Sequence, residues 1–147
     1  MRKLTLFLAL VLTTMLVAQP TVSIQDQKML VTSGENTYVL VPNGDNASYF
    51  WASVSPDGKH IVYVTARYGT FVCDINGENV RSMGRMNAPK WLDNNHVSGM
   101  QEFYKDHDEI DHIRYISRSI DGKVTRDLTA TEQATFIQLE EARIAKE

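Results

Sequence analysis

The sequence is poor in cysteine, with the single residue Cys73 among 147. One thiol cannot form an internal disulfide, and no Cys-x-x-Cys pair is present to build a redox centre or a cysteine-rich zinc site. We expect Cys73 to be a small buried residue of a strand, as free cysteines usually are.

An excess of positive charge is also lacking. The chain has 15 basic and 18 acidic residues and a net charge of −3. Neutralising phosphates requires clustered Lys and Arg, so nucleic acid is excluded as a partner.

The known catalytic and nucleotide-binding motifs are missing as well. There is no Gly-x-Ser-x-Gly elbow, phosphate loop or dinucleotide fingerprint. Ser55, Asp57 and His60 fall within one tight turn, where convergence into a triad is not expected. We therefore predict no catalytic residue and no enzymatic activity.

The only long apolar run lies at the N-terminus. Arg2 and Lys3 precede an apolar or small stretch, residues 4–17, and the small residue Ala18. This pattern predicts a secretory signal peptide, residues 1–18, cleaved near Ala18-Gln19, and a periplasmic or secreted product. An uncleaved anchor is the rival interpretation, but the run is shorter than the roughly 20 residues of a spanning helix, so no membrane span is expected after cleavage.

Strand-like segments fill most of the remaining sequence. They are short, rich in β-branched, aromatic or other apolar residues, and bounded by turn residues. The expected strands cover residues 29–32, 37–41, 49–54, 60–65, 70–75, 80–83 and 97–100. Residues 49–83 thus predict a four-stranded antiparallel meander. Residues 131–147 predict a helix capped by Thr131, or a frayed and partly disordered tail.

These parts recur in the same order. Asn43-Gly44, Asn76-Gly77 and Asp121-Gly122 each follow one apolar strand and precede another. Their spacing is close to the roughly 40 residues of a four-stranded propeller blade. Pro56-Asp57-Gly58 adds the type of turn that opens such a unit, since Pro presets φ and Gly accepts a positive φ.

A resemblance to a known family rests on five segments: Val54 to Lys59, Cys73 to Gly77, Ala88 to Trp91, Ile120 to Gly122 and Leu128-Thr129. They resemble the WD-like repeat of TolB-like β-propellers, which has a Trp-Ser-Pro-Asp-Gly-Lys turn and then an Asp-x-Asx-Gly turn. Val54 replaces the family's Trp, and Leu-Asp-Asn-Asn at 92–95 replaces the second Ser-Pro-Asp-Gly turn. The resemblance covers residues 37–129.

It implies an all-β fold: a partial propeller of two to three four-stranded antiparallel blades over residues 19–130, with a short C-terminal helix. A closed propeller has about 4–8 blades. The chain is therefore a truncated relative of a longer protein, a unit whose copies assemble into a ring as a homo-oligomer, or an unstable product. Truncation is the favoured interpretation.

Two places are candidate recognition sites. One is Tyr68, in the turn Arg67-Tyr68-Gly69. The other is a charged loop with four carboxylates and two imidazoles, which comprises Asp106, His107, Asp108, Glu109, Asp111 and His112. Asp106, His107, Asp108, Asp111 and His112 could bind calcium or zinc, although their spacing fits neither an EF-hand nor a helical zinc site. The alternative is a loop that only water contacts, with no cofactor.

The predicted function is an exported, non-enzymatic propeller segment that binds protein or cell-envelope polymer. The alternatives are an accessory propeller of a peptidase or glycan-processing hydrolase without its catalytic domain, and a calcium- or zinc-binding module.

Overall fold

The computed structural model describes residues 18–146. The predicted signal peptide therefore lies outside the described residues, except for Ala18. No helix between residues 18 and 146 has the length and apolar character needed to cross a membrane.

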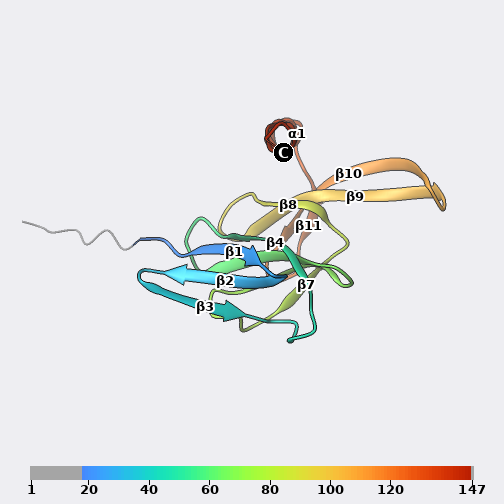
Figure 1. Cartoon of the computed structure of the whole chain (residues 1–147). Coiled ribbons are helices and arrows are strands. Elements are labelled where there is room, and N and C mark those ends of the chain that lie inside the picture. The colour runs from blue at the N-terminus through green and yellow to red at the C-terminus, as the bar shows by residue number, and fades with distance from the viewer. Residues whose placement is uncertain (1–17, 147) are drawn as a thin grey trace, which may run out of the picture.

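Eleven strands of the described part form three separate antiparallel sheets (Figure 1). The first sheet has the order β1-β2-β3, the second β4-β5-β6-β7 and the third β11-β10-β9-β8. The strands are β1 Thr21–Gln25, β2 Lys28–Ser33, β3 Asn36–Leu40, β4 Tyr49–Val54, β5 His60–Thr65, β6 Gly69–Asp74, β7 Arg81–Gly84, β8 Asn87–Trp91, β9 His96–Asp106, β10 Glu109–Ser119 and β11 Thr125–Asp127. One helix, α1, spans Ala130–Ile144.

The prediction of a partial TolB-like β-propeller is wrong. The described residues form open sheets of three, four and four strands, and these do not close into a ring. A repeated hairpin pattern determines which strands pair within a sheet, because such pairing is local in sequence. It does not determine how whole sheets are arranged about an axis, which depends on contacts between distant residues.

The strand positions and the meander agree with the prediction. Strands β2 to β7 lie within about two residues of the expected segments, and β4 to β7 pair in chain order. The turn Pro56-Asp57-Gly58 joins β4 to β5, Asn76-Gly77 joins β6 to β7, and Asp121-Gly122 joins β10 to β11. Gly58 and Gly122 have φ of +73° and +74°, which only glycine adopts without strain.

The second sheet is buried on both faces. Successive residues of a strand point to opposite sides, so Ile61 and Tyr63 of β5 pack against the first sheet while Val62 packs against the third. The first core also includes Met29, Val31, Leu40, Ala47, Tyr49 and Cys73; the second includes Val72, Met83, Met86, Val97 and Ile116. The near-continuous apolar sequence of β5 follows from this position between two sheets.

Cys73 lies in β6 as expected. It is fully buried, and burial raises the pKa of its thiol to about 12. The thiol is therefore protonated at neutral pH and is not a nucleophile.

The N-cap of helix α1 lies two residues before the predicted one. Thr129, rather than Thr131, is the N-cap: its hydroxyl accepts the backbone N–H of Glu132, and the Glu132 carboxylate accepts the backbone N–H of Thr129. This reciprocal pair is a capping box. Phe136 is the one buried residue of α1, where its ring meets Tyr115 of β10 with centroids 5.7 Å apart.

Strands β9 and β10 extend beyond their sheet as a two-stranded arm (Figure 1). Strand β8 pairs with β9 only as far as Met100, and β11 pairs with β10 only from Ile116 onward. Between these points β9 and β10 pair only with each other, although Gln101 bonds the carbonyl of Arg85 and Arg114 pairs with Asp127 of β11. Residues 103–114 are exposed.

Replacing Ile61 by Ala should destabilise the protein, because it leaves a cavity in the first core. We expect the free energy of unfolding to fall by about 2–5 kcal/mol. Val39→Ala is the control, since the Val39 side chain is 57% exposed on β3, and should cost less than about 0.5 kcal/mol. Urea denaturation measures both; equal losses would contradict the position of the core.

Replacing Thr129 by Ala should loosen α1, whereas Thr131→Ala should not. Loss of an N-cap costs about 1 kcal/mol, which speeds local hydrogen exchange about fivefold. Exchange of the α1 amides, followed by NMR, measures the effect. A faster exchange in Thr131→Ala than in Thr129→Ala would assign the cap to the originally predicted residue.

Candidate functional site

The residues singled out from the sequence for recognition are exposed. Tyr68 lies in the β5–β6 turn with 61% of its surface exposed. Asp106, Asp108, Glu109 and Asp111 lie at the end of the β9–β10 arm, and all are exposed. Tyr68 and the arm lie on different hairpins and line no common pocket among those found in the described part.

The candidate metal ligands do not converge. Within residues 18–146 no group of three or more His, Cys, Asp and Glu side chains is placed to hold a metal ion. His112 instead pairs with Asp111 at 2.8 Å and stacks on Phe103 with ring centroids 4.5 Å apart. The five candidate ligands are spread over two strands and their turn: Asp106 ends β9, His107 and Asp108 form the turn, and Asp111 and His112 lie in β10.

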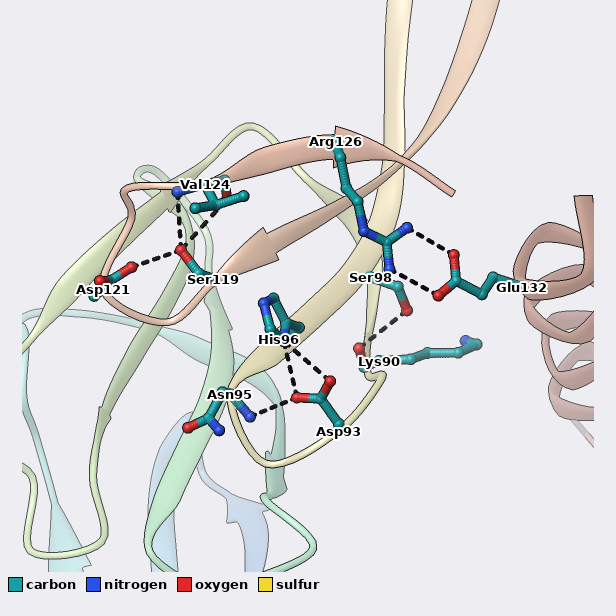
Figure 2. Close-up of polar contacts among 10 residues, drawn as sticks. All are labelled: Lys90, Asp93, Asn95, His96, Ser98, Ser119, Asp121, Val124, Arg126 and Glu132. Carbon is teal, nitrogen blue, oxygen red and sulfur yellow. Dashed lines mark hydrogen bonds and ion pairs between the residues drawn. The ribbon is translucent and has the colours of Figure 1, made fainter. Parts of the chain in front are cut away.

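Three histidines pair with carboxylates, as the orienting groups of a catalytic triad do. His96 Nδ1 lies 3.0 Å from both carboxylate oxygens of Asp93 in the β8–β9 turn (Figure 2). His60 Nε2 lies 3.6 Å from Asp74, and His112 pairs with Asp111. A nucleophile in hydrogen-bond contact with one of these imidazoles would complete the arrangement.

No hydroxyl or thiol among the described residues makes that contact. Ser119 is the cross-strand partner of His96, but its hydroxyl donates to Asp121 at 2.6 Å (Figure 2). Ser55 likewise donates to Asp57 at 2.6 Å, not to His60. Both serines stabilise their turns, because the hydroxyl of Ser55 also accepts the backbone N–H of His60, and that of Ser119 the backbone N–H of Val124. The described histidines therefore form no triad.

One concave surface lies where β1, β4 and β8 approach one another. We call it the tryptophan groove. It is lined by Gln19, Pro20, Thr21, Val22, Trp51, Ala52, Ser53, Val54, Ser55, Pro56, Lys90 and Trp91, and its volume is about 540 Å³. Each of the three strands is the edge of its own sheet and has a paired neighbour on one side only within the described part. Unpaired backbone N–H and C=O groups therefore lie along the groove.

Two hydrogen bonds cross the groove and fix its width. The indole N–H of Trp91 donates to the carbonyl of Ser53 at 3.0 Å and ties β8 to β4. The amide of Gln19 donates to the carbonyl of Pro56 at 2.8 Å and ties the start of β1 to the β4–β5 turn. The groove is thus preformed, which lowers the entropic cost of binding.

Lys90 is the charged residue of the groove lining. Its ammonium lies 2.5 Å from the carboxylate of Glu140 on α1 and 5.0 Å from the centre of the Phe136 ring. The Lys90 and Glu140 side chains are 18% and 14% exposed, so water screens their attraction less than at an open surface. Arg143 also bonds Glu140 at 2.7 Å, and these two cations lower the pKa of the Glu140 carboxyl.

A smaller hollow adjoins the groove and shares Trp51 and Lys90 with it. We call it the α1 hollow. It has a volume of about 240 Å³ and is lined by Phe50, Trp51, Val64, Ala88, Pro89, Lys90, Glu140 and Arg143. Aromatic and aliphatic side chains make up most of its lining, and Lys90, Glu140 and Arg143 supply its charges.

The wall of the α1 hollow contains a strained residue. Ala88 has φ of +48° although it is not glycine, and it precedes Pro89, which further restricts its backbone. Such a conformation costs on the order of 1–2 kcal/mol. The pairing of β8 with β9 is irregular between Asn87 and Lys90, so the strain marks a bulge that changes the direction of β8 next to Lys90.

The opposite end of α1 is held by a bidentate pair. Figure 2 shows the guanidinium of Arg126 facing the carboxylate of Glu132, with two hydrogen bonds of 2.7 Å. Together with the Thr129 backbone N–H, Arg126 lowers the Glu132 pKa from 4.5 to about 2. Lys90 and Arg126 therefore position α1 through one carboxylate near each end of the helix.

Sequence reasoning missed these residues. Trp91 was named only as the end of the segment Ala88 to Trp91, and the Lys90–Glu140 contact joins residues 50 positions apart, so no local motif marks it. Pro89 within a strand was the one available signal, because proline interrupts strand pairing and is typical of edges and bulges.

Comparison with known protein families finds no family that matches the chain, and comparison with curated proteins finds no match either. Among solved structures, the chain is similar to the apo form of the isopeptidase AtxE2. The TM-score is 0.53 at 15% sequence identity, over 82% of this chain and 31% of that one. The chain thus spans about a third of the isopeptidase's length.

The comparison overturns two predictions. The absence of a family match removes the support for a TolB-like protein. The expected non-enzymatic propeller segment is also wrong, since the arrangement of these sheets is shared with part of an enzyme. At 15% identity the likeness shows the fold alone and transfers no catalytic residue.

Acid should weaken the attachment of α1 through Glu132. Its pKa is lower in the folded state, so its contribution is present above about pH 4.5 and is lost as the pH falls toward about 2. The difference in unfolding free energy between the wild type and Glu132→Gln should therefore shrink over that range. Urea denaturation at pH 6, 4 and 2.5 measures it, with Glu141→Gln as the control on the same helix. A difference that stays constant with pH would contradict this role of Glu132.

Proposed function

We propose that the chain forms the peptide-binding part of an amide-bond hydrolase, in which the tryptophan groove holds an extended segment of a peptide substrate. The observation that carries the proposal is the meeting of three unpaired strand edges, β1, β4 and β8, along one preformed groove.

Strand edges recognise peptides by adding a strand. Backbone hydrogen bonds to the edge supply affinity, and pockets for alternate side chains supply selectivity. Trp51 and Trp91 give the groove two large, rigid apolar surfaces on which such side chains can pack. The crossing bonds of Trp91 and Gln19 occupy the carbonyls of Ser53 and Pro56 and keep the strand edges apart, which leaves the other edge groups to a ligand.

The similarity to part of an isopeptidase supports an amide as the bond of the substrate. The described residues of this chain contain no nucleophile bonded to a histidine, so we assign them the binding of the substrate rather than the chemical step. Export through residues 1–18 remains a prediction.

A peptide selection tests the groove directly. A phage-displayed library of dodecapeptides is panned against the full chain, and the affinities of the enriched peptides are measured by calorimetry. Thr21→Lys should weaken their binding at least about tenfold, because it puts a long charged side chain on the groove edge of β1.

Ser23→Lys is the matched control. Ser23 is exposed on the same face of β1 two residues away but does not line the groove. Its variant should bind within about twofold of the wild type. A library that enriches no peptide, or peptides that lose the same affinity in both variants, would reject the groove as the binding site.

A further inference from the structure

In the α1 hollow, Lys90 already binds a carboxylate, that of Glu140. The Glu140 carboxylate lies 2.5 Å from the Lys90 ammonium, and both side chains line a hollow whose other lining residues are mostly apolar. Phe50 beside it is 58% exposed, so an aromatic face is available to a ligand. An apolar floor beside a cation is complementary to an apolar amino-acid residue that carries a free carboxylate.

The size of the hollow limits the ligand. Its volume of about 240 Å³ is below the roughly 300–1,000 Å³ of pockets for drug-sized molecules. It is suited to one amino-acid residue. Because Trp51 and Lys90 line both the hollow and the tryptophan groove, a peptide in the groove can place its last residue in the hollow.

The attachment of helix α1 allows another carboxylate to replace that of Glu140 on Lys90. Phe136 is the buried residue of the helix, and Leu139 and Ile144 are 54% and 58% exposed. The helix thus has a narrow apolar contact with the sheet, supported by the pairs of Glu132 and Glu140. Release of Glu140 from Lys90 leaves the capping box and the Phe136 contact in place.

We infer that the α1 hollow is a subsite for the C-terminal residue of a peptide, whose side chain packs on Phe50, Trp51 and Pro89 and whose carboxylate replaces Glu140 on Lys90. Glu140 is then an internal competitor, which keeps Lys90 neutralised until a peptide carboxylate arrives. This inference rests on the proposed peptide-binding function and specifies which end of the peptide the site recognises.

The test uses two small probes on the full chain, N-acetyl-L-leucine and N-acetyl-L-leucinamide, which differ in the carboxylate. Titration followed by NMR, with the indole N–H of Trp51 as the reporter, should show the acid binding at least about tenfold more tightly than the amide. Equal affinities would overturn the inference.

Variants of the ion pair give the second arm. Glu140→Gln should bind N-acetyl-L-leucine about tenfold more tightly, because it removes the competing charge and keeps the shape. Glu141→Gln, the exposed neighbour on α1, is its control and should match the wild type. Unchanged or weaker binding in Glu140→Gln would overturn the inference.

Lys90→Met should remove the preference for the acid over the amide, whereas Lys59→Met, at an exposed lysine of the β4–β5 turn, should keep it. A preference that survives in Lys90→Met would also overturn the inference. The two proposals fail separately: peptides that bind the groove without a preference for a free carboxylate would reject the subsite alone, and a library that enriches no peptide would reject the groove.

Discussion

Strand β5 has apolar side chains on both faces, and the packing of all three sheets depends on it. Ile61 and Tyr63 join the core shared with the first sheet, and Val62 joins the core shared with the third. A sheet covered on both faces must present apolar residues in succession. Burying them is favourable, because each Å² of apolar surface removed from water contributes about 25 cal/mol to stability. The second sheet thus fixes the distance between the other two.

The polar atoms in the first core are satisfied by one turn residue. Asn43 accepts the hydroxyl proton of Tyr63 through its side chain, and its backbone N–H donates to the hydroxyl of Tyr49. The tyrosine rings lie 5.7 Å apart and fill the core below these hydrogen bonds. Two large rings can be fully buried here because their hydroxyl groups end at a loop that supplies partners.

This packing leaves β1, β4 and β8 as neighbouring unpaired edges and so creates the tryptophan groove. Its charged boundary comes from elsewhere in the chain: α1 crosses the third sheet, and its carboxylates meet Lys90 and Arg126. The strained backbone at Ala88 lies at the junction of these parts. Backbone strain is typical of functional sites, where neighbouring residues stabilise a conformation that is otherwise unfavourable. The strain at Ala88 is therefore consistent with a functional site.

Local structure followed from the sequence because its causes are local. Alternating apolar runs placed β2 to β7, turn residues such as Gly58 and Gly122 marked the hairpins, and the terminal helix was expected within two residues of its start. The cap was missed because Thr129 and Thr131 both offer a hydroxyl, and only the backbone geometry selects Thr129. The candidate metal ligands are also close in sequence, yet within residues 18–146 no group of three or more of them is placed to hold a metal ion.

What the tertiary structure alone decided is how the sheets sit together. The repeat of hairpins is compatible with a propeller, yet the arrangement of open sheets depends on contacts between residues far apart, such as Trp91 with Ser53 and Lys90 with Glu140. The candidate site consists of these contacts. The sequence by itself determined strands β2 to β7, the turns and the buried Cys73, because each depends on neighbouring residues. The groove depends on the packing of three sheets, and the α1 hollow on that of the helix as well, which no local pattern encodes.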